Sequence, residues 1–158
     1  MKKGQRQHMT PDEFIDMLAP TVHEVCHNYN LPASVCIAQA ILESGWGRYV
    51  IGNYNYFGRK YNGWGDYEEV TTQEYWDGEY HTIVDKFQSY TSLEEAIVDW
   101  CVLMREEPVY AAALNTWETT WSVEDFVYAM SPIYATDPEY GNKIMATINA
   151  NNLMQYDG

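Results

Sequence analysis

Basic residues are scarce in this chain. Lys and Arg number 9 against 23 Asp and Glu in 158 residues, which gives a formal net charge of −14 at pH 7. A chain of this charge repels nucleic-acid phosphates and anionic lipid headgroups, and it leaves no basic patch to bind them. We therefore expect neither a nucleic acid nor a membrane surface as a partner.

Long hydrophobic runs and paired cysteines are also missing. No run of about 18 apolar residues occurs, and no apolar segment follows the charged N-terminus MKKGQRQHMT, so neither a membrane anchor nor a signal peptide is visible. The three cysteines, Cys26, Cys36 and Cys101, are odd in number and lack CxxC spacing, which indicates reduced thiols in a core. There is no internal repeat. The length fits one domain, and we expect a flexible segment over residues 1–10 followed by that domain over residues 11–158.

Capping residues and helical periodicity predict a mainly α domain of six or seven helices. A capping box over 10–13, with proline at the first helical position, starts a helix over about 11–29, which Pro20 either kinks or restarts. Pro32 leads into a second helix that ends at Gly45. Further helices are expected from Ser92 to before Pro108, over about 109–115, from Ser122 through Met130, and from Asp137-Pro138 to about 151.

One β-hairpin interrupts this helical pattern. Strand-forming residues over 67–75 and 80–87 flank Asp77-Gly78, a strong hairpin turn. Before them, residues 45–65 contain six glycines and read as an irregular loop. Loops of that length inside a compact domain are usually functional.

Glu43 is the first candidate for chemistry. It lies in the last turn of the second helix, IAQAILESGWG over 37–47, whose residues are apolar on all sides. A carboxylate there, facing Trp46, loses the water that favours its charged form, so its pKa is expected to rise toward neutrality. That property suits a general acid. The alternative is a buried carboxylate paired with an Arg or Lys.

The hairpin carries four further acids, Glu68, Glu69, Glu74 and Glu79. Together with Glu43 they suggest glycosidase chemistry, in which one acid protonates the leaving oxygen and a second assists water or stabilises positive charge. Spacing alone does not say which glutamate is the second. The alternative is that all four are solvated surface charges.

Several sequence blocks together resemble glycoside hydrolase family 73, the glucosaminidase domain of bacterial autolysins, flagellar peptidoglycan hydrolases and phage endolysins. The blocks are AQAILESGWG, NYNYFGRK, TTQEYWDGE, KFQSYTSLEEAIVDW, PVYAAAL and YATDPEYGNKI, in the order of the family. The resemblance implies a lysozyme-like single domain with the hairpin bordering the cleft. It also implies cleavage of the β-1,4 bond between N-acetylglucosamine and N-acetylmuramic acid in peptidoglycan.

The resemblance also implies roles for individual residues. It makes Glu43 the catalytic acid, Glu74 the second carboxylate on a mobile hairpin, and Tyr134 a catalytic-site residue near the N-acetyl group. The residues that it implies contact or shape the sugar groove are Trp46, Tyr54, Asn55, Phe57 and Gly58. It implies no cofactor and no metal.

The expected partner is the glycan strand of peptidoglycan, bound by a monomer, with a separate wall-binding domain or subunit as an option because the chain is so acidic. The expected place of action is the bacterial cell wall. A phage lysin released through a holin and a secreted enzyme whose signal has been removed are both compatible with the absence of a visible signal peptide.

Two alternatives belong to other classes. His23, Glu24 and His27 match the H-E-x-x-H pattern of zinc peptidases, in which two histidines one turn apart bind the metal. The apolar stripe of the same helix turns both histidines toward solvent, and no extended motif follows. The other alternative is a non-catalytic wall-binding module, against which the presence of both Glu43 and Glu74 argues.

Overall fold

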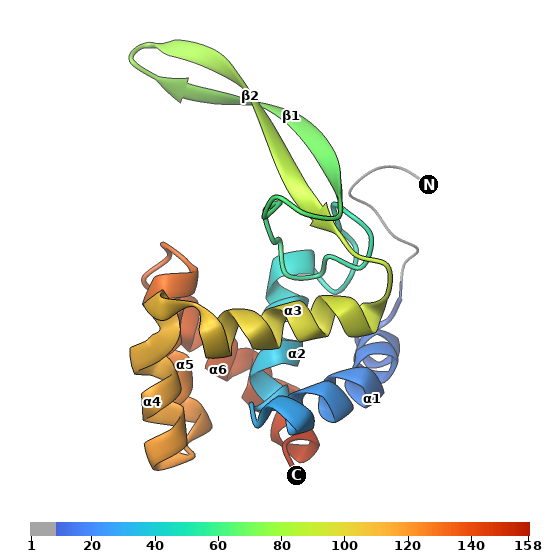
Figure 1. Cartoon of the computed structure of the whole chain (residues 1–158), viewed down its shortest axis with the longest axis vertical. Helices are drawn as coiled ribbons and strands as arrows, with labels where there is room; N and C mark the ends of the chain where they lie inside the picture. Colours follow the sequence, from blue (N-terminus) through green and yellow to red (C-terminus); the bar gives the residue numbers. More distant parts are fainter. Residues whose placement is uncertain (1–8) are drawn as a thin grey trace.

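The computed structural model describes residues 9–158, so the expected flexible segment over 1–10 lies outside the described range except for its last two residues. Over that range the chain forms a helical body from which one antiparallel hairpin projects (Figure 1). The elements are α1 Pro11–Tyr29, α2 Ala33–Ser44, β1 Asp66–Trp76, β2 Glu79–Ser89, α3 Leu93–Glu106, η1 Pro108–Tyr110, α4 Ala111–Thr120, α5 Val123–Tyr134, α6 Tyr140–Ala150 and η2 Leu153–Tyr156. The mainly α architecture with one hairpin is confirmed.

Helix α1 begins at the predicted capping box. The Glu13 amide donates to Thr10 Oγ1 at 3.1 Å, and the Thr10 amide donates to Glu13 Oε1 at 2.8 Å. Pro20 lies inside one continuous helix, so the alternative of a restart at that residue is wrong. Ser92 and Ser122 also cap their helices as predicted, each through its side-chain oxygen.

Helix α2 is the centre of the body, in contact with α1, α6 and η2. Every residue from Ala33 to Ile41 is buried, which confirms a helix that is covered all round. The helix ends at Gly45, whose φ of +56° is in the left-handed region that glycine adopts without strain. Glu43 is therefore held in the last turn of the most enclosed helix of the fold.

Two helix boundaries differ from the prediction. The short helix expected over 109–115 is the 3-10 turn η1 followed by α4, which continues to Thr120. Helix α6 begins at Tyr140 and not at Asp137-Pro138, because the Asp137 carboxylate accepts the Glu139 amide at 2.9 Å and its carbonyl accepts the Tyr140 amide at 3.1 Å. These bonds make a turn of residues 137–139, and that turn delivers the Tyr140 ring against α2.

The loop over 45–65 is irregular but firmly tied down by two buried amides. Asn55 accepts the Arg59 amide and donates to the carbonyls of Arg59 and Gln88, all within 2.9 Å. Gln88 in turn accepts the Asn62 amide at 3.1 Å and donates to the Trp64 carbonyl at 2.9 Å. The loop is thereby fastened to the root of β2.

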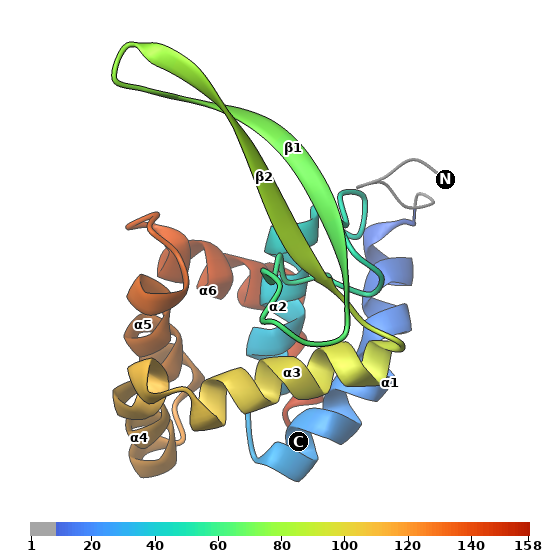
Figure 2. The same ribbon diagram turned by 45° about the horizontal axis from the view of Figure 1, so that its top comes forward.

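The hairpin leaves this root and extends beyond the helices (Figures 1 and 2). Its register pairs Glu74 with His81 and Val70 with Asp85, so Glu74, His81 and Asp85 lie on one face of the ribbon. That face turns toward the body at the root, where Lys60 forms an ion pair with Asp85 at 3.0 Å. Its tip extends away from the helices (Figure 1).

The core of the body is apolar, and the largest fully buried side chains include Trp100, Phe14, Phe57 and Phe126. Each such side chain stabilises the fold by about 1.5–3 kcal/mol. The three cysteines are free and buried, as predicted, with Cys26 Sγ 3.8 Å from Cys101 Sγ. No helix within residues 9–158 is long and apolar enough to cross a membrane.

Candidate active site

Glu43 opens into a small cavity between the helical body and the loop over 45–65. The cavity has a volume of about 220 Å³. Its lining comes from α2, the loop, α3, η1 and α5: Glu43, Phe57, Gly58, Arg59, Lys60, Leu103, Tyr110 and Tyr134. One carboxylate among aromatic and basic side chains is an arrangement that can donate a proton to a bound ligand.

The carboxyl group of Glu43 is desolvated although the residue faces the cavity. Burial raises the pKa of Glu43, and a hydrogen bond from the Tyr140 hydroxyl to Glu43 Oε2, at 2.8 Å, opposes that rise in part. No Arg or Lys within residues 9–158 forms an ion pair with Glu43, so the alternative of a paired carboxylate is wrong for this range. The expected direction of the pKa shift is confirmed.

A chain of hydrogen bonds connects Glu43 to the core. The Trp100 indole N–H donates to Gln39 Oε1 at 2.7 Å, and the Gln39 amide donates to the Tyr140 oxygen at 3.2 Å. Because that oxygen already accepts a bond from Gln39, the hydroxyl proton of Tyr140 is free to point at Glu43. Gln39 and Trp100 are fully buried, so the direction of this donor is set from inside the fold.

Tyr134, Phe57 and Gly58 are brought together at the cavity, as the sequence predicted. The Tyr134 hydroxyl donates to the Phe57 carbonyl at 3.0 Å, and its ring lies parallel to that of Tyr140 with centroids 5.9 Å apart. Gly58 has a φ of +65°, and a Cβ at this position would lie 3.5 Å from Glu43 Oε1. Its missing side chain leaves the carboxyl group open to the cavity.

The other predicted groove residues lie elsewhere. Trp46 was expected to face Glu43, but it packs edge-on against Phe14, with centroids 6.2 Å apart, and does not line the Glu43 cavity. Tyr54 is 42% exposed on the loop, also outside that cavity. Asn55 is buried and uses its amide within the loop, so it shapes the wall from behind.

Glu74 is exposed near the tip of the hairpin, on the face that turns toward the body at the root. It lies four residues beyond Val70, the partner of Asp85, and therefore about 13 Å farther out than the ion pair with Lys60. Glu79 is exposed as well, and Glu68 is half-buried at the root, where it accepts the Gly52 amide. In this conformation Glu43 has no carboxylate neighbour from the hairpin in its cavity.

Three residues of the site were not identified from the sequence: Tyr140, Gln39 and Arg59. Tyr140 reads as one more apolar position on the stripe of its helix, and only its place beside α2 shows its role. Gln39 offers a signal, because a lone amide within a wholly apolar helix must find a buried partner. Arg59 had no such signal in the sequence.

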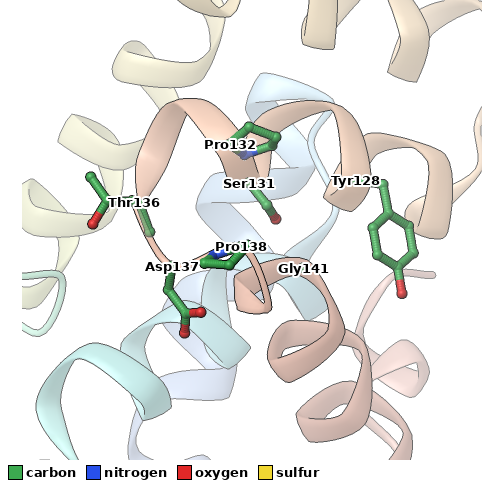
Figure 3. A pocket seen from close by; sticks show the side chains of 8 residues that line it. Tyr128, Ser131, Pro132, Thr136, Asp137, Pro138 and Gly141 are labelled. Carbon is green, nitrogen blue, oxygen red and sulfur yellow. The ribbon is translucent and has the colours of Figure 1, made fainter.

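A larger cavity, of about 410 Å³, lies between the end of α5 and the start of α6 (Figure 3). Asp137 is its one acidic side chain, and Lys143 forms an ion pair with that carboxylate at 2.6 Å. This ion pair and its hydrogen bonds lower the pKa of Asp137, which makes it a poor proton donor. The larger cavity is therefore a weaker candidate for catalysis than the smaller one.

The H-E-x-x-H residues lie on the solvent face of α1. His23, Glu24 and His27 are exposed, and none of them lines the cavity around Glu43. His23 Nε2 lies 2.7 Å from the Gly158 carbonyl oxygen. Within residues 9–158 no cluster of three potential metal ligands occurs.

Comparisons with known proteins agree with this geometry. A family model described as mannosyl-glycoprotein endo-beta-N-acetylglucosaminidase (Glucosaminidase) matches residues 19–153. An autolysin of Enterococcus faecalis is 36% identical over 157 residues, 94% of this chain and 21% of the autolysin. The peptidoglycan hydrolase FlgJ of Escherichia coli is 36% identical over 140 residues, 83% of this chain and 44% of FlgJ. The chain thus spans less than half the length of these two relatives.

A solved structure shares the fold. The catalytic domain of the autolysin Auto from Listeria monocytogenes superposes with a TM-score of 0.78 at 34% identity, covering 96% of this chain and 90% of that one. The superposition includes nearly the whole described chain, so the helical body with its projecting hairpin is an architecture that this autolysin domain also has.

Proposed function

This chain belongs to the glucosaminidase family, glycoside hydrolase family 73, and from that premise we propose that it hydrolyses bacterial peptidoglycan. The bond is the β-1,4 linkage between N-acetylglucosamine and N-acetylmuramic acid, and the chain acts on the cell wall. The matched relatives named autolysin and peptidoglycan hydrolase support this substrate.

The observation that carries the proposal is the state of Glu43. Its pKa is raised by burial, it has no ion-pair partner within residues 9–158, and it opens into a cavity lined by aromatic rings. A carboxyl group of that kind keeps its proton to a higher pH than an exposed glutamate and can donate it to the leaving oxygen. Tyr134, Phe57 and Gly58 shape the cavity wall on which the sugar lies.

Glu74 is the second carboxylate of the proposed mechanism, and it acts after the hairpin moves. The two carboxyl groups of a glycosidase act about 5–9.5 Å apart. In this structure Glu74 lies about 13 Å farther along the hairpin than the Lys60–Asp85 ion pair at the root, so the hairpin has to move before Glu74 can act with Glu43. A two-stranded ribbon is marginally stable by itself, so bending of the outer hairpin over a bound strand is inexpensive. Closure brings Glu74 toward the developing positive charge and expels water.

The remaining proposals concern the wider assembly. The domain over 11–158 works as a monomer, without cofactor or metal. Because the chain is strongly acidic, retention on a wall that carries anionic polymers is assigned to a separate wall-binding domain or subunit.

Turbidity loss of purified cell walls, followed by mass spectrometry of the released fragments, tests the function. We expect lysis with N-acetylglucosamine at every new reducing end. New reducing ends on N-acetylmuramic acid would assign the other glycan bond. Tight wall binding without any fragment would favour the non-catalytic wall-binding module.

A further inference from the structure

A second cavity adjoins the one that holds Glu43. It has a volume of about 350 Å³ and lies between the loop and the outer face of α3. Arg59 and Leu103 line both cavities, so the two are neighbours with a shared wall. Its other lining residues are Asn62, Trp64, Glu95, Val98, Asp99, Val102 and Glu107.

The chemistry of this α3 cavity is unlike that of the Glu43 cavity. Its floor is aliphatic, made by Val98, Val102 and Leu103 on one face of the helix. The Trp64 indole forms one side and is 55% exposed. Glu107 is exposed at the rim, with no ion-pair partner among residues 9–158. The cavity thus offers small apolar contacts together with two carboxylates that form no ion pair among the described residues, Glu95 and Glu107.

Arg59 stands at the junction with donors to spare. Its Nε donates to Asp99 Oδ2 at 3.3 Å, and the Tyr90 hydroxyl donates to the same oxygen at 2.5 Å, which holds the guanidinium in place. Arg59 also forms a side-chain hydrogen bond with Tyr90. A guanidinium has five N–H donors, so Arg59 keeps donors beyond its contacts with Asp99 and Tyr90, and its side chain is 25% exposed. The junction between the cavities therefore carries a fixed cation that can bind a carbonyl or carboxylate oxygen.

We propose that the α3 cavity binds the peptide stem of N-acetylmuramic acid, and that Arg59 binds the oxygen of the lactyl group from which the stem branches. This inference rests on the proposed function. In peptidoglycan the lactyl group joins the sugar, which lies in the Glu43 cavity, to a peptide. That peptide begins with alanine and contains a diamino acid.

The match is one of position and of chemistry. The proposal places the branch point of the substrate at Arg59, the one basic side chain among residues 9–158 that lines both cavities. The alanyl methyl suits the aliphatic floor, and the amine of the diamino acid suits Glu107. A sugar ring is the competing occupant, because the Trp64 ring and the polar side chains of Asn62 and Glu95 also suit a pyranose. The two glycan preparations described below distinguish it from the peptide stem.

Binding to two matched glycan preparations tests the proposal. One preparation keeps its stems, and the other has been treated with an amidase that leaves a carboxylate on each lactyl group. Affinities are measured by calorimetry with Glu43→Gln protein, so that no ligand is cleaved. Trp64→Ala should weaken binding of stemmed strands about tenfold and change binding of stripped strands less than about twofold. Trp121→Ala is the matched control, because Trp121 is 54% exposed and lines neither cavity, and it should change neither affinity.

Arg59 provides a second contrast. Arg59→Gln should weaken both preparations, since the stripped strand still presents the lactyl carboxylate, and Glu107→Gln should weaken stemmed strands alone. Equal loss on both preparations for Trp64→Ala would make the cavity a sugar subsite and overturn the proposal, as would no loss on either. Because binding is measured without turnover, failure of the wild-type protein to cleave walls would refute the proposed function and leave this contrast intact.

Discussion

The two candidate carboxylates lie in contrasting regions, one in the buried body and the other on the exposed hairpin. Glu43 is at the end of a helix that is covered on all sides, and its hydrogen-bond partner is oriented by Gln39 and Trp100 from the core. Glu74 is exposed on the outer half of a ribbon that extends beyond the helices (Figure 1). The helical body therefore fixes the position of Glu43, whereas the position of Glu74 depends on movement of the hairpin.

The two regions therefore suit two different steps, proton donation by Glu43 and closure of the hairpin over the substrate. A general acid needs a tuned pKa, which requires fixed neighbours and exclusion of water. A group that approaches only when substrate is bound needs a support that bends at low cost. The amides of Asn55 and Gln88 mark the border between the two regions, because they fasten the hairpin root and nothing comparable fastens its tip.

The largest expected effect is at Glu43. Glu43→Gln should lower wall hydrolysis at least about 100-fold, because the amide has nearly the same shape but no proton to give to the leaving oxygen. Turbidity assays measure the loss, and circular dichroism checks the fold. Near-full activity with an unchanged spectrum would remove Glu43 from the mechanism.

The second largest effect on activity is expected at Glu74. Glu74→Gln should lower kcat roughly tenfold to 100-fold and change KM little, because a carboxylate that meets developing positive charge acts mainly in the transition state. Glu79→Gln, exposed beyond the turn on the same ribbon, is the control and should be nearly silent. An essential Glu79 beside a dispensable Glu74 would show that the wrong carboxylate has been assigned.

Stability should respond to the body and not to the hairpin. Gln39→Leu should lower the free energy of unfolding by about 2 kcal/mol, because the buried Trp100 N–H is left without an acceptor. Gln73→Leu removes an exposed bond to Thr82 on the hairpin and should change stability by less than about 0.5 kcal/mol. Urea denaturation of both variants compares the two regions directly, and equal losses would contradict the contrast.

The pH profile should shift when Tyr140 is changed. The Tyr140 hydroxyl donates to the carboxylate of Glu43 and so favours its charged form, which means that Tyr140→Phe raises the pKa of Glu43 further. The acid then stays protonated to higher pH, and the alkaline limb of kcat/KM should move upward by about one pH unit. If the acidic limb moved upward in its place, Glu43 would act as a base.

The smallest expected effect concerns α1. Chelation by EDTA and the substitution His27→Ala should both leave lysis unchanged, because the exposed His23 and His27 lie outside the Glu43 cavity. If chelation abolished lysis, Zn²⁺ restored it and His27→Ala protein were inactive, catalysis would depend on a metal bound at α1. Neither Glu43 nor Glu74 would then be the catalytic carboxylate.

Local patterns were enough to predict most of the elements. The capping boxes, the hairpin turn at Asp77-Gly78 and the apolar run before Glu43 each depend on neighbours a few residues away, so helices and strands were located within a few positions. The exceptions are the end of α4, which continues to Thr120, and the start of α6. Asp137 and Pro138 have the pattern of a helix start, and a turn formed in its place because side-chain and backbone bonds there compete with the helix.

From the sequence alone come the helical class, the hairpin and the identity of Glu43 as an acid at the end of an apolar helix. Only the tertiary structure decided which aromatic ring meets that acid: Tyr140, 97 residues away in sequence, and not Trp46, three residues away. It also placed Arg59 between two cavities. The reason is that contacts across the fold depend on how helices cross and where loops are fastened, and such distances are not encoded in the spacing of residues along the chain.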